Sequence, residues 1–285
     1  MSKTRQEHIL NLSDIIESDA EFIPLLSIED EMVMNAESIP SELPILPLRN
    51  AVLFPGVVIP ITVGRNKSIQ LVREAYRGDK TIGVIAQKDP SIEDPSEDDL
   101  FQIGTVASIL KTLQMPDGNT TVIIQVKKRF RLIHISQSEP CFRATVDAFE
   151  VEEPVSNDPG FLALIQSIKD IAIKIIHHSP NIPSEASIAI NNIESPGFLV
   201  HFVSSNLNIS NTEKQVLLEI SDLSERAHKV LAALTKDLQM LDLKNQIQNK
   251  VKTDTDKQQR DYFLNQQLKT IQEELGGTPN ELEIN

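Results

Sequence analysis

Apolar and polar side chains alternate most clearly between residues 120 and 135. Successive side chains of a β-strand point to opposite faces of a sheet, so this period of two predicts a half-buried strand. One face carries the apolar residues Val122, Ile124, Val126, Phe130 and Leu132. The other face carries Gln125, Lys127, Arg129 and Arg131. We expect this strand to form a hairpin with residues 104–115 across a turn at residues 116–119, where proline and glycine occur together.

Shorter apolar runs on either side of the hairpin add further strands. Residues 43–49 are expected to form an edge strand, because Pro44 and Pro47 cannot donate a hydrogen bond to a central ladder. The other strands are expected at residues 57–63, 80–87 and 142–148. Five or six strands with one helix predict a small closed or nearly closed β structure over residues 43–153.

The single helix of this β-rich region is expected at residues 66–76. Asn66 can act as its N-terminal cap, and Gly78 follows its last turn. The stretch from Gly64 to Ser68 contains glycine, lysine and serine but lacks the order and the upstream glycine of a phosphate-binding loop. We therefore interpret it as the start of this helix.

The hydrophobic period changes from two to between three and four after Pro154, which predicts helices. Asp158 is placed to cap a helix whose first residue is proline, and Ser195 is placed in the same way before Pro196. Another short helix is expected to open at Pro183. These signals define a helical subdomain over residues 154–209.

The remaining chain, residues 210–277, is predicted to form a long helical arm, because no glycine or proline occurs between Phe198 and Leu275. Ser210 and Glu213 have the spacing of a capping box, which would begin a helix running to Val251. The polar segment 252–257 is expected to break that helix. Beyond the break, coiled-coil or bundle packing is predicted by the spacing of Leu264, Leu268, Ile271 and Leu275. A tail occupies residues 278–285.

The net charge of −14 is concentrated at the N-terminus. Residues 1–42 contain ten acidic residues against two basic residues, so we expect an extension that is disordered or only partly helical. An acidic surface does not favour a nucleic-acid backbone. No apolar run approaches the roughly 18 residues that a transmembrane helix needs, and the first residues do not resemble a signal peptide. The sequence therefore predicts no membrane partner.

No grouping of residues in the sequence indicates catalysis or metal binding. Cys141 is the only cysteine; we interpret it as a small core residue, and its isolation fits a reducing, cytoplasmic location. His177 and His178 are neighbours, so on a helix they point about 100° apart and cannot share a metal ion. We expect no catalytic residue, cofactor site or metal site in this chain.

A basic segment around Phe130 admits two interpretations. Lys127, Lys128, Arg129 and Arg131 surround that aromatic residue on one strand, as in an RNA-binding face. The alternation instead favours a solvated basic face with Phe130 pointing inward.

Four segments, taken in order, resemble the N-terminal region of the Lon protease family. Residues 43–56 resemble the opening of that domain, and residues 104–107 and 129–132 resemble its later strands. Residues 212–219 resemble the start of the family's connecting helix, and residues 262–276 the segment before its ATPase module. Asn265 departs from the pattern, since arginine is more usual there, and the acidic extension lies outside it.

The resemblance implies an α+β fold: a PUA-like β pseudobarrel followed by a helical bundle and a long helical or coiled-coil arm. It also implies a parent protein that is an ATP-dependent serine endopeptidase, works as a homohexamer with ATP and magnesium, and degrades misfolded, damaged and regulatory proteins. This chain would be the region that engages unfolded or damaged substrates. The alternative is a stand-alone Lon-domain adaptor or a PUA-like RNA-binding module.

Two sets of apolar residues on the arm are candidates for these roles. The substrate-contact candidates are Leu238, Met240, Leu241 and Leu243, which are too many for one narrow stripe on a helix. The same residues could instead pack against the arm of a neighbouring subunit. The oligomerisation candidates are Leu264, Leu268, Ile271 and Leu275.

Overall fold

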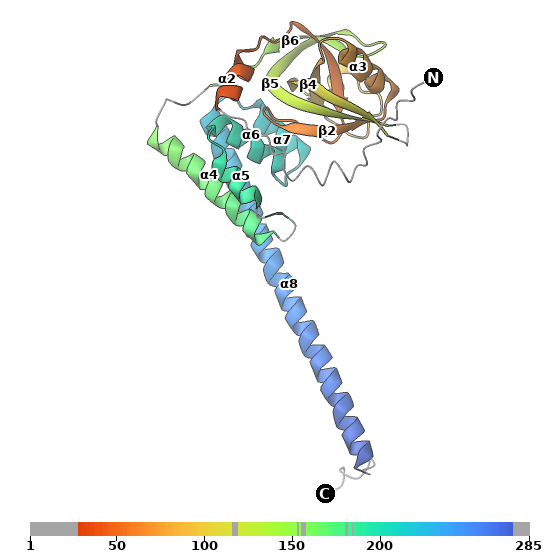
Figure 1. Ribbon diagram of the computed structural model, residues 1–285, viewed down its shortest axis with the longest axis vertical. Coiled ribbons are helices and arrows are strands. Elements are labelled where there is room, and N and C mark those ends of the chain that lie inside the picture. Colours follow the sequence, from red (N-terminus) through yellow and green to blue (C-terminus); the bar gives the residue numbers. More distant parts are fainter. Residues whose placement is uncertain are drawn as a thin grey trace, which may run out of the picture. The chain divides into compact units, whose positions relative to one another are not determined.

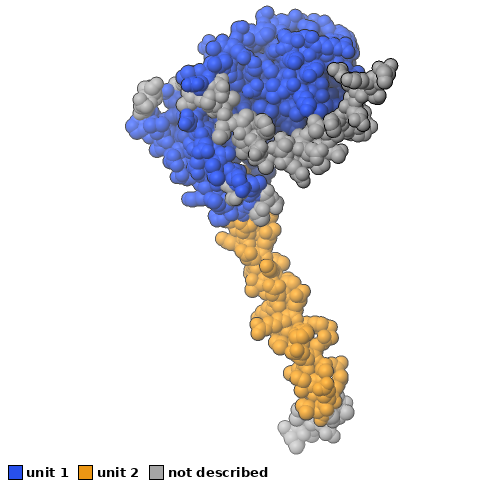
Figure 2. Space-filling view, in the orientation of Figure 1, with its two compact units in different colours: residues 1–235 blue, residues 236–285 orange. Residues whose placement is uncertain are grey.

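The computed structural model describes residues 28–115, 119–152, 154, 158–179, 182–183 and 185–275. The chain divides into two compact units, residues 1–235 and residues 236–285 (Figure 2). The expected extension up to residue 27, most of the hairpin turn and the tail at 278–285 lie outside the described residues.

Six strands of the first unit form one sheet that closes on itself (Figure 1). The strands are β1 (Glu42–Leu48), β2 (Val58–Val63), β3 (Thr81–Ala86), β4 (Ile103–Gln114), β5 (Thr120–Gln137) and β6 (Arg143–Ala148). Their order is β2-β5-β4-β3-β1-β6, and β5 also pairs with β6. Five strands therefore form a ring, to which β2 is added beyond β5. This ring agrees with the expected closed β structure, while its likeness to a PUA-like pseudobarrel stays a prediction.

The long strand β5 has the alternation that its sequence predicts. Val122, Ile124, Val126 and Phe130 have no exposed surface, and Leu132 is buried as well. The space for the Phe130 ring is provided by two glycines. A Cβ atom on Gly83 or Gly104 would lie 3.0 or 2.9 Å from the Phe130 Cζ atom. Because these two positions have no side chain, the aromatic side chain of Phe130 can fill the middle of the ring of strands.

The prediction that residues 43–49 form an edge strand is wrong, since β1 lies between β3 and β6. The two neighbours pair with different halves of β1. Pairing with β6 covers Glu42–Pro44, and pairing with β3 covers Ile45–Leu48. The Ile45 amide donates to the Phe142 carbonyl on the β6 side. By alternation the Pro47 nitrogen faces the same side, beyond the last β6 pair, and the Pro44 nitrogen faces β3 before that ladder begins. Neither proline therefore interrupts a ladder.

The segment preceding the ring includes a helix, α2 (Ile28–Ala36). Its Met34 is 8% exposed and belongs to the core shared with the helices of the first unit. The acidic extension therefore does not stay separate from the folded domain up to residue 42. The sequence analysis did not predict this packing, because three acidic residues open the helix and Met34 is preceded by two apolar residues that stay exposed.

Helix α3 (Asn66–Arg77) packs on the ring through Leu71, Val72 and Ala75. Gly78 follows it as predicted. The predicted cap is wrong by one residue: Arg65 is the N-cap, and no side chain hydrogen-bonds to the first amides.

Four helices follow the ring: α4 (Pro159–His178), α5 (Glu185–Asn192), α6 (Pro196–Asn206) and α7 (Asn211–Glu219). The predicted caps are confirmed, because Asp158 accepts a hydrogen bond from the Gly160 amide and Ser195 accepts one from the Phe198 amide. These helices share a core with Val52, Phe54 and Ile103 of the β region.

The long helix begins later than the sequence predicts. The Ser210–Glu213 capping box is confirmed, but the helix that it opens is α7, which ends at Glu219. Helix α8 (Leu223–Glu274) starts anew, with the Asp222 carboxylate accepting from the Ser224 and Glu225 amides at 2.7 and 3.1 Å. Its first residues bury Arg226, Val230 and Leu234 in the core of the first unit, among others.

The predicted break at residues 252–257 is wrong, because α8 is helical throughout that segment. Polar residues alone do not end a helix without glycine or proline. Thr253 and Thr255 also donate their hydroxyls to the carbonyls four residues earlier, at 2.9 and 2.8 Å. From residue 236 to residue 275 no side chain is buried within the chain.

Candidate functional site

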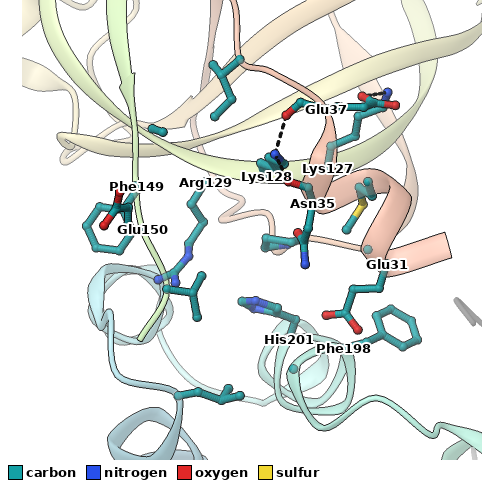
Figure 3. Close-up of a pocket in the computed structure, with 18 of the residues that line it drawn as sticks. Glu31, Asn35, Glu37, Lys127, Lys128, Arg129, Phe149, Glu150, Phe198 and His201 are labelled. Carbon is teal, nitrogen blue, oxygen red and sulfur yellow. Dashed lines mark hydrogen bonds and ion pairs between the residues drawn. The ribbon is translucent and has the colours of Figure 1, made fainter. Parts of the chain in front are cut away.

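A cavity of about 430 Å³ lies within the first unit, between the β ring and the helices (Figure 3). Its walls come from α2, β5, the residues after β6, the beginning of α6 and the beginning of α8. The labelled side chains of Arg129, His201, Asn35 and Glu31 surround the opening in Figure 3. The cavity therefore joins elements that are distant in sequence, and several of its side chains are charged.

Arg129 connects the ring to the helices. It is 3% exposed, and its Nη1 atom donates to the carbonyls of Leu218 and Ile220 at 2.8 and 2.6 Å. Its guanidinium also lies 4.6 Å from the centre of the Phe149 ring. Burial, with the charge of Arg226 as a smaller cause, lowers the pKa of Arg129 to about 9. The side chain remains mostly charged at neutral pH.

Arg226 and His201 form the floor of the same region. Arg226 is fully buried, donates to the Ile220 carbonyl through Nη2, and has Nη1 3.2 Å from the His201 Nε2 atom. Burial lowers the pKa of Arg226 to about 10, against the opposing effect of Asp222. Burial, followed by the charges of Arg226 and Arg129, lowers the pKa of His201 well below 6.5. His201 is thus neutral at pH 7, and its Nε2 atom can accept from Arg226.

Three buried nitrogen atoms around this cavity have no hydrogen-bond partner within the described parts of the chain. They are Arg129 Nη2, Arg226 Nε and His201 Nδ1. A buried polar group without a partner costs free energy, and buried charged groups cost more than neutral ones. The site therefore has an unmet demand for hydrogen-bond acceptors.

Helix α2 lines one side of the cavity, and lysines of β5 attach its last turn and the residue that follows it. Lys127 forms an ion pair with the Glu37 carboxylate, and Lys128 donates to the carbonyls of Asn35 and Glu37 (Figure 3). At the other end of α2, Glu31 lies against the first turn of α6. Its Oε1 atom is 3.0 Å from the position that a Cβ atom on Gly197 would occupy. A carboxylate is favourable there because the N-terminus of a helix carries partial positive charge.

The basic segment predicted at residues 127–131 is thus engaged within the chain. Phe130 points inward and has no surface on which a nucleic-acid base could stack, as the inward interpretation predicted. The expectation of a solvated basic face is wrong for Arg129, which α7 covers. Arg131 is exposed and lies 5.7 Å from the centre of the Phe149 ring.

The candidate site residues from the sequence all lie in the second unit. Leu238 and Leu241 are half-buried, whereas Met240 and Leu243 are 60% and 50% exposed. The oligomerisation candidates, which are between 50% and 80% exposed, are Leu264, Leu268, Ile271 and Leu275. None of the eight belongs to the lining of the cavity.

Sequence reasoning missed the cavity and its buried arginines. One signal was present: Arg226 interrupts the apolar stripe that Leu223, Ala227 and Val230 form at the start of α8. Cys141 is buried as predicted, and burial raises the pKa of its thiol. His177 and His178 lie in the last turn of α4.

Comparison with known proteins identifies the family. The model of the "ATP-dependent protease La (LON) substrate-binding domain" matches residues 42–236. The chain belongs to the Lon substrate-binding domain family. Among related proteins, the Lon protease of Flavobacterium johnsoniae is 57% identical over 268 residues, covering 94% of this chain and 33% of that protein. The Lon protease of Cytophaga hutchinsonii is 52% identical over 264 residues, covering 93% of this chain and 32% of that protein.

This Lon-family chain therefore spans about a third of the length of those relatives. A solved structure, the N-terminal domain of the Mycobacterium avium complex Lon protease, matches with a TM-score of 0.58 and 18% identity. The match covers 68% of this chain and 98% of that one. At this identity the match shows a shared fold, which is a mixed α+β fold.

We expect no cofactor or metal site in this chain. The sequence contains no phosphate-binding loop. Across the described ranges, no three His, Cys, Asp or Glu residues are grouped so that they could hold a metal ion. None of the helices in those ranges combines the length and hydropathy that crossing a bilayer requires.

Proposed function

We propose that this chain is the polypeptide-recognition region of a longer, cytoplasmic Lon protease, an ATP-dependent serine endopeptidase that degrades misfolded, damaged and regulatory proteins. The family is named for substrate binding, and the related Lon proteases are about three times as long as this chain. ATP, magnesium and the catalytic residues belong to the other parts of the proposed parent. The ring of five strands supports the proposal that the β region is a PUA-like pseudobarrel.

The observation that carries the proposal is the exposure of large apolar side chains on α8. Met240 and Leu243 are followed along the same helix by Ile247 and Val251, which are 55% and 59% exposed. Unfolded proteins differ from folded ones by exposing apolar segments, so a receptor for many sequences needs adaptable apolar surface. Met240 suits this role because its side chain is flexible and polarizable.

Replacing Met240 and Leu243 together by serine is expected to weaken binding of an unfolded model protein by about tenfold, because two apolar contacts are lost. Fluorescence titration of the full chain measures the affinity. The matched control replaces Gln239 and Lys244, which are exposed on the same helix, by serine and should leave the affinity unchanged. If both double variants bind like the original chain, α8 is not the contact surface.

A second proposal concerns assembly. Leu264, Leu268, Ile271 and Leu275 recur at intervals of four and three residues and are exposed within this chain. Such spacing places them on one side of a helix, as in a coiled coil, so we propose that they help subunits of a hexamer associate. Helix α8 also makes a stand-alone adaptor or RNA-binding module the weaker alternative, since neither function needs exposed apolar residues along a helix.

Replacing Leu264 and Leu268 by serine is expected to abolish the concentration-dependent rise in mass that the original chain should show in light scattering. The control replaces Gln266 and Gln267, which are exposed between them, by serine. A mass that is the same for all three proteins at every concentration would remove the assembly proposal. A mass that still rises in the Leu264/Leu268 variant would place the contact elsewhere.

A further inference from the structure

Helix α2 lines one side of the cavity and presents a small apolar surface to the core. Among the side chains of α2 that the structure describes, Met34 alone is buried, whereas Met32 and Val33 are each 65% exposed. The remaining attachment is polar: Glu37 to Lys127, and backbone carbonyls to Lys128. A helix of nine residues is too short to be stable without its packing contacts. Its position therefore depends in part on the packing of Met34 and on charge-assisted hydrogen bonds to β5.

Helix α2 does not fill the space beside it and does not supply all the hydrogen-bond acceptors that the buried side chains there could use. About 430 Å³ of cavity remains beside it. The buried Arg129 Nη2, Arg226 Nε and His201 Nδ1 atoms still have no partner within the described ranges. A ligand with more carboxylate groups could fill the space and accept hydrogen bonds from these atoms, two of which belong to charged arginines, because charge-assisted hydrogen bonds are the stronger ones.

We propose that this cavity is a docking site for an acidic segment of another polypeptide, and that α2 is a tethered placeholder which such a segment displaces. This inference goes beyond the proposed function, since it concerns the first unit and requires none of the apolar side chains of α8.

The contacts of α2 define the chemistry of the partner. Glu31, Met34 and Glu37 are spaced three residues apart, so an apolar anchor is flanked on both sides by a carboxylate. One carboxylate lies against the first turn of α6, the apolar side chain enters the core, and the other carboxylate pairs with Lys127. A partner with this pattern and an additional acidic side chain matches the charge of the site better than α2 does.

The test uses a fluorescent synthetic peptide with the sequence of residues 28–39, added to the full chain, with anisotropy as the readout. Met34→Ser loosens the tethered helix and should make the peptide bind at least tenfold more tightly than to the original chain. Met32→Ser, on the exposed face of the same helix, should leave the affinity unchanged. Adding Lys127→Ser and Lys128→Ser to the Met34→Ser chain should remove the gain. Equal affinities for the original chain and the Met34→Ser variant would overturn the proposal.

Two further measurements keep the test decisive if Met34→Ser disturbs folding. Excess peptide added to the original chain should accelerate amide hydrogen exchange in residues 33–37 and leave exchange in α3 unchanged. A peptide with Glu31→Lys and Glu37→Lys should neither bind nor accelerate exchange, and a scrambled peptide of the same composition should bind at least tenfold more weakly than the native one. Unchanged exchange in residues 33–37, or equal binding of the native and scrambled peptides, would contradict displacement of α2.

Discussion

Arg129→Ala is expected to lower the free energy of unfolding of the first unit by about 3–5 kcal/mol. The substitution removes the donor of one buried and one partly buried hydrogen bond. The Leu218 carbonyl loses this donor, whereas the Ile220 carbonyl keeps its hydrogen bond from Arg226. It also removes the guanidinium that packs on the Phe149 ring. Relief of the repulsion between Arg129 and Arg226 offsets only part of this loss, since that repulsion is a smaller influence on Arg129 than its burial.

Arg131→Ala is the matched control for this prediction. Arg131 lies two residues further along β5 and approaches the same Phe149 ring, but it is exposed. Its loss should change the free energy of unfolding by no more than about 1 kcal/mol. Urea unfolding is monitored through hydrogen exchange of the β3 and β4 amides, so that the measurement reports on the first unit alone. Similar effects of the two substitutions would show that Arg129 does not join the ring to the helices.

Phe130→Ala is expected to lower the free energy of unfolding by about 3–5 kcal/mol, as for other fully buried aromatic residues. Phe130 has no exposed surface, and Gly83 and Gly104 both leave space for its ring. Gly83 and Gly104 both face the aromatic ring of Phe130. Because neither has a side chain, neither position can fill the space that the substitution leaves. The same exchange-detected urea unfolding measures the loss.

Ile133→Ala serves as the control on the same strand, because Ile133 is 55% exposed. It should cost less than about 1 kcal/mol. A loss below about 1.5 kcal/mol for Phe130→Ala would mean that the interior of the ring can rearrange around the missing side chain.

Local sequence patterns predicted where helices and strands occur better than they predicted which elements lie side by side. The alternation in residues 120–135 and the caps at Asp158, Ser195 and Ser210 depend on nearby residues, and they are present in the structure. The place of β1 inside the sheet could not be predicted, because it depends on which half of the strand each neighbour covers. Local chemistry indicated an edge strand, and the long-range pairing decided otherwise.

The two corrections along the arm have different causes. The end of α7 at Glu219 follows from tertiary contacts: the Ile220 carbonyl accepts from both Arg129 and Arg226 instead of continuing a helix. Arg129 lies on β5, 91 residues before Ile220, so spacing along the sequence does not reveal this contact. The predicted break at residues 252–257 was an error of propensity, since polar side chains are compatible with a helix.

The candidate sites show the same limit. The apolar residues of α8 could be found from the sequence, because helical periodicity shows which of them lie on the same face of one helix. The cavity could not, because it combines α2, β5, α6 and α8, and no spacing along the chain brings these together. The basic segment around Phe130 could be seen in the sequence, but its partners in α2 and α7 could not.

The most direct test of the proposed function compares one reporter protein in its native form and in a reduced, alkylated form that cannot fold. The full chain is titrated into each form at the same ionic strength and temperature, with fluorescence anisotropy as the readout. Recognition through the exposed apolar side chains of α8 predicts binding of the unfolded form at least about tenfold tighter than binding of the native form. Equal affinity for the two forms would contradict the proposal that this chain recognises unfolded polypeptides.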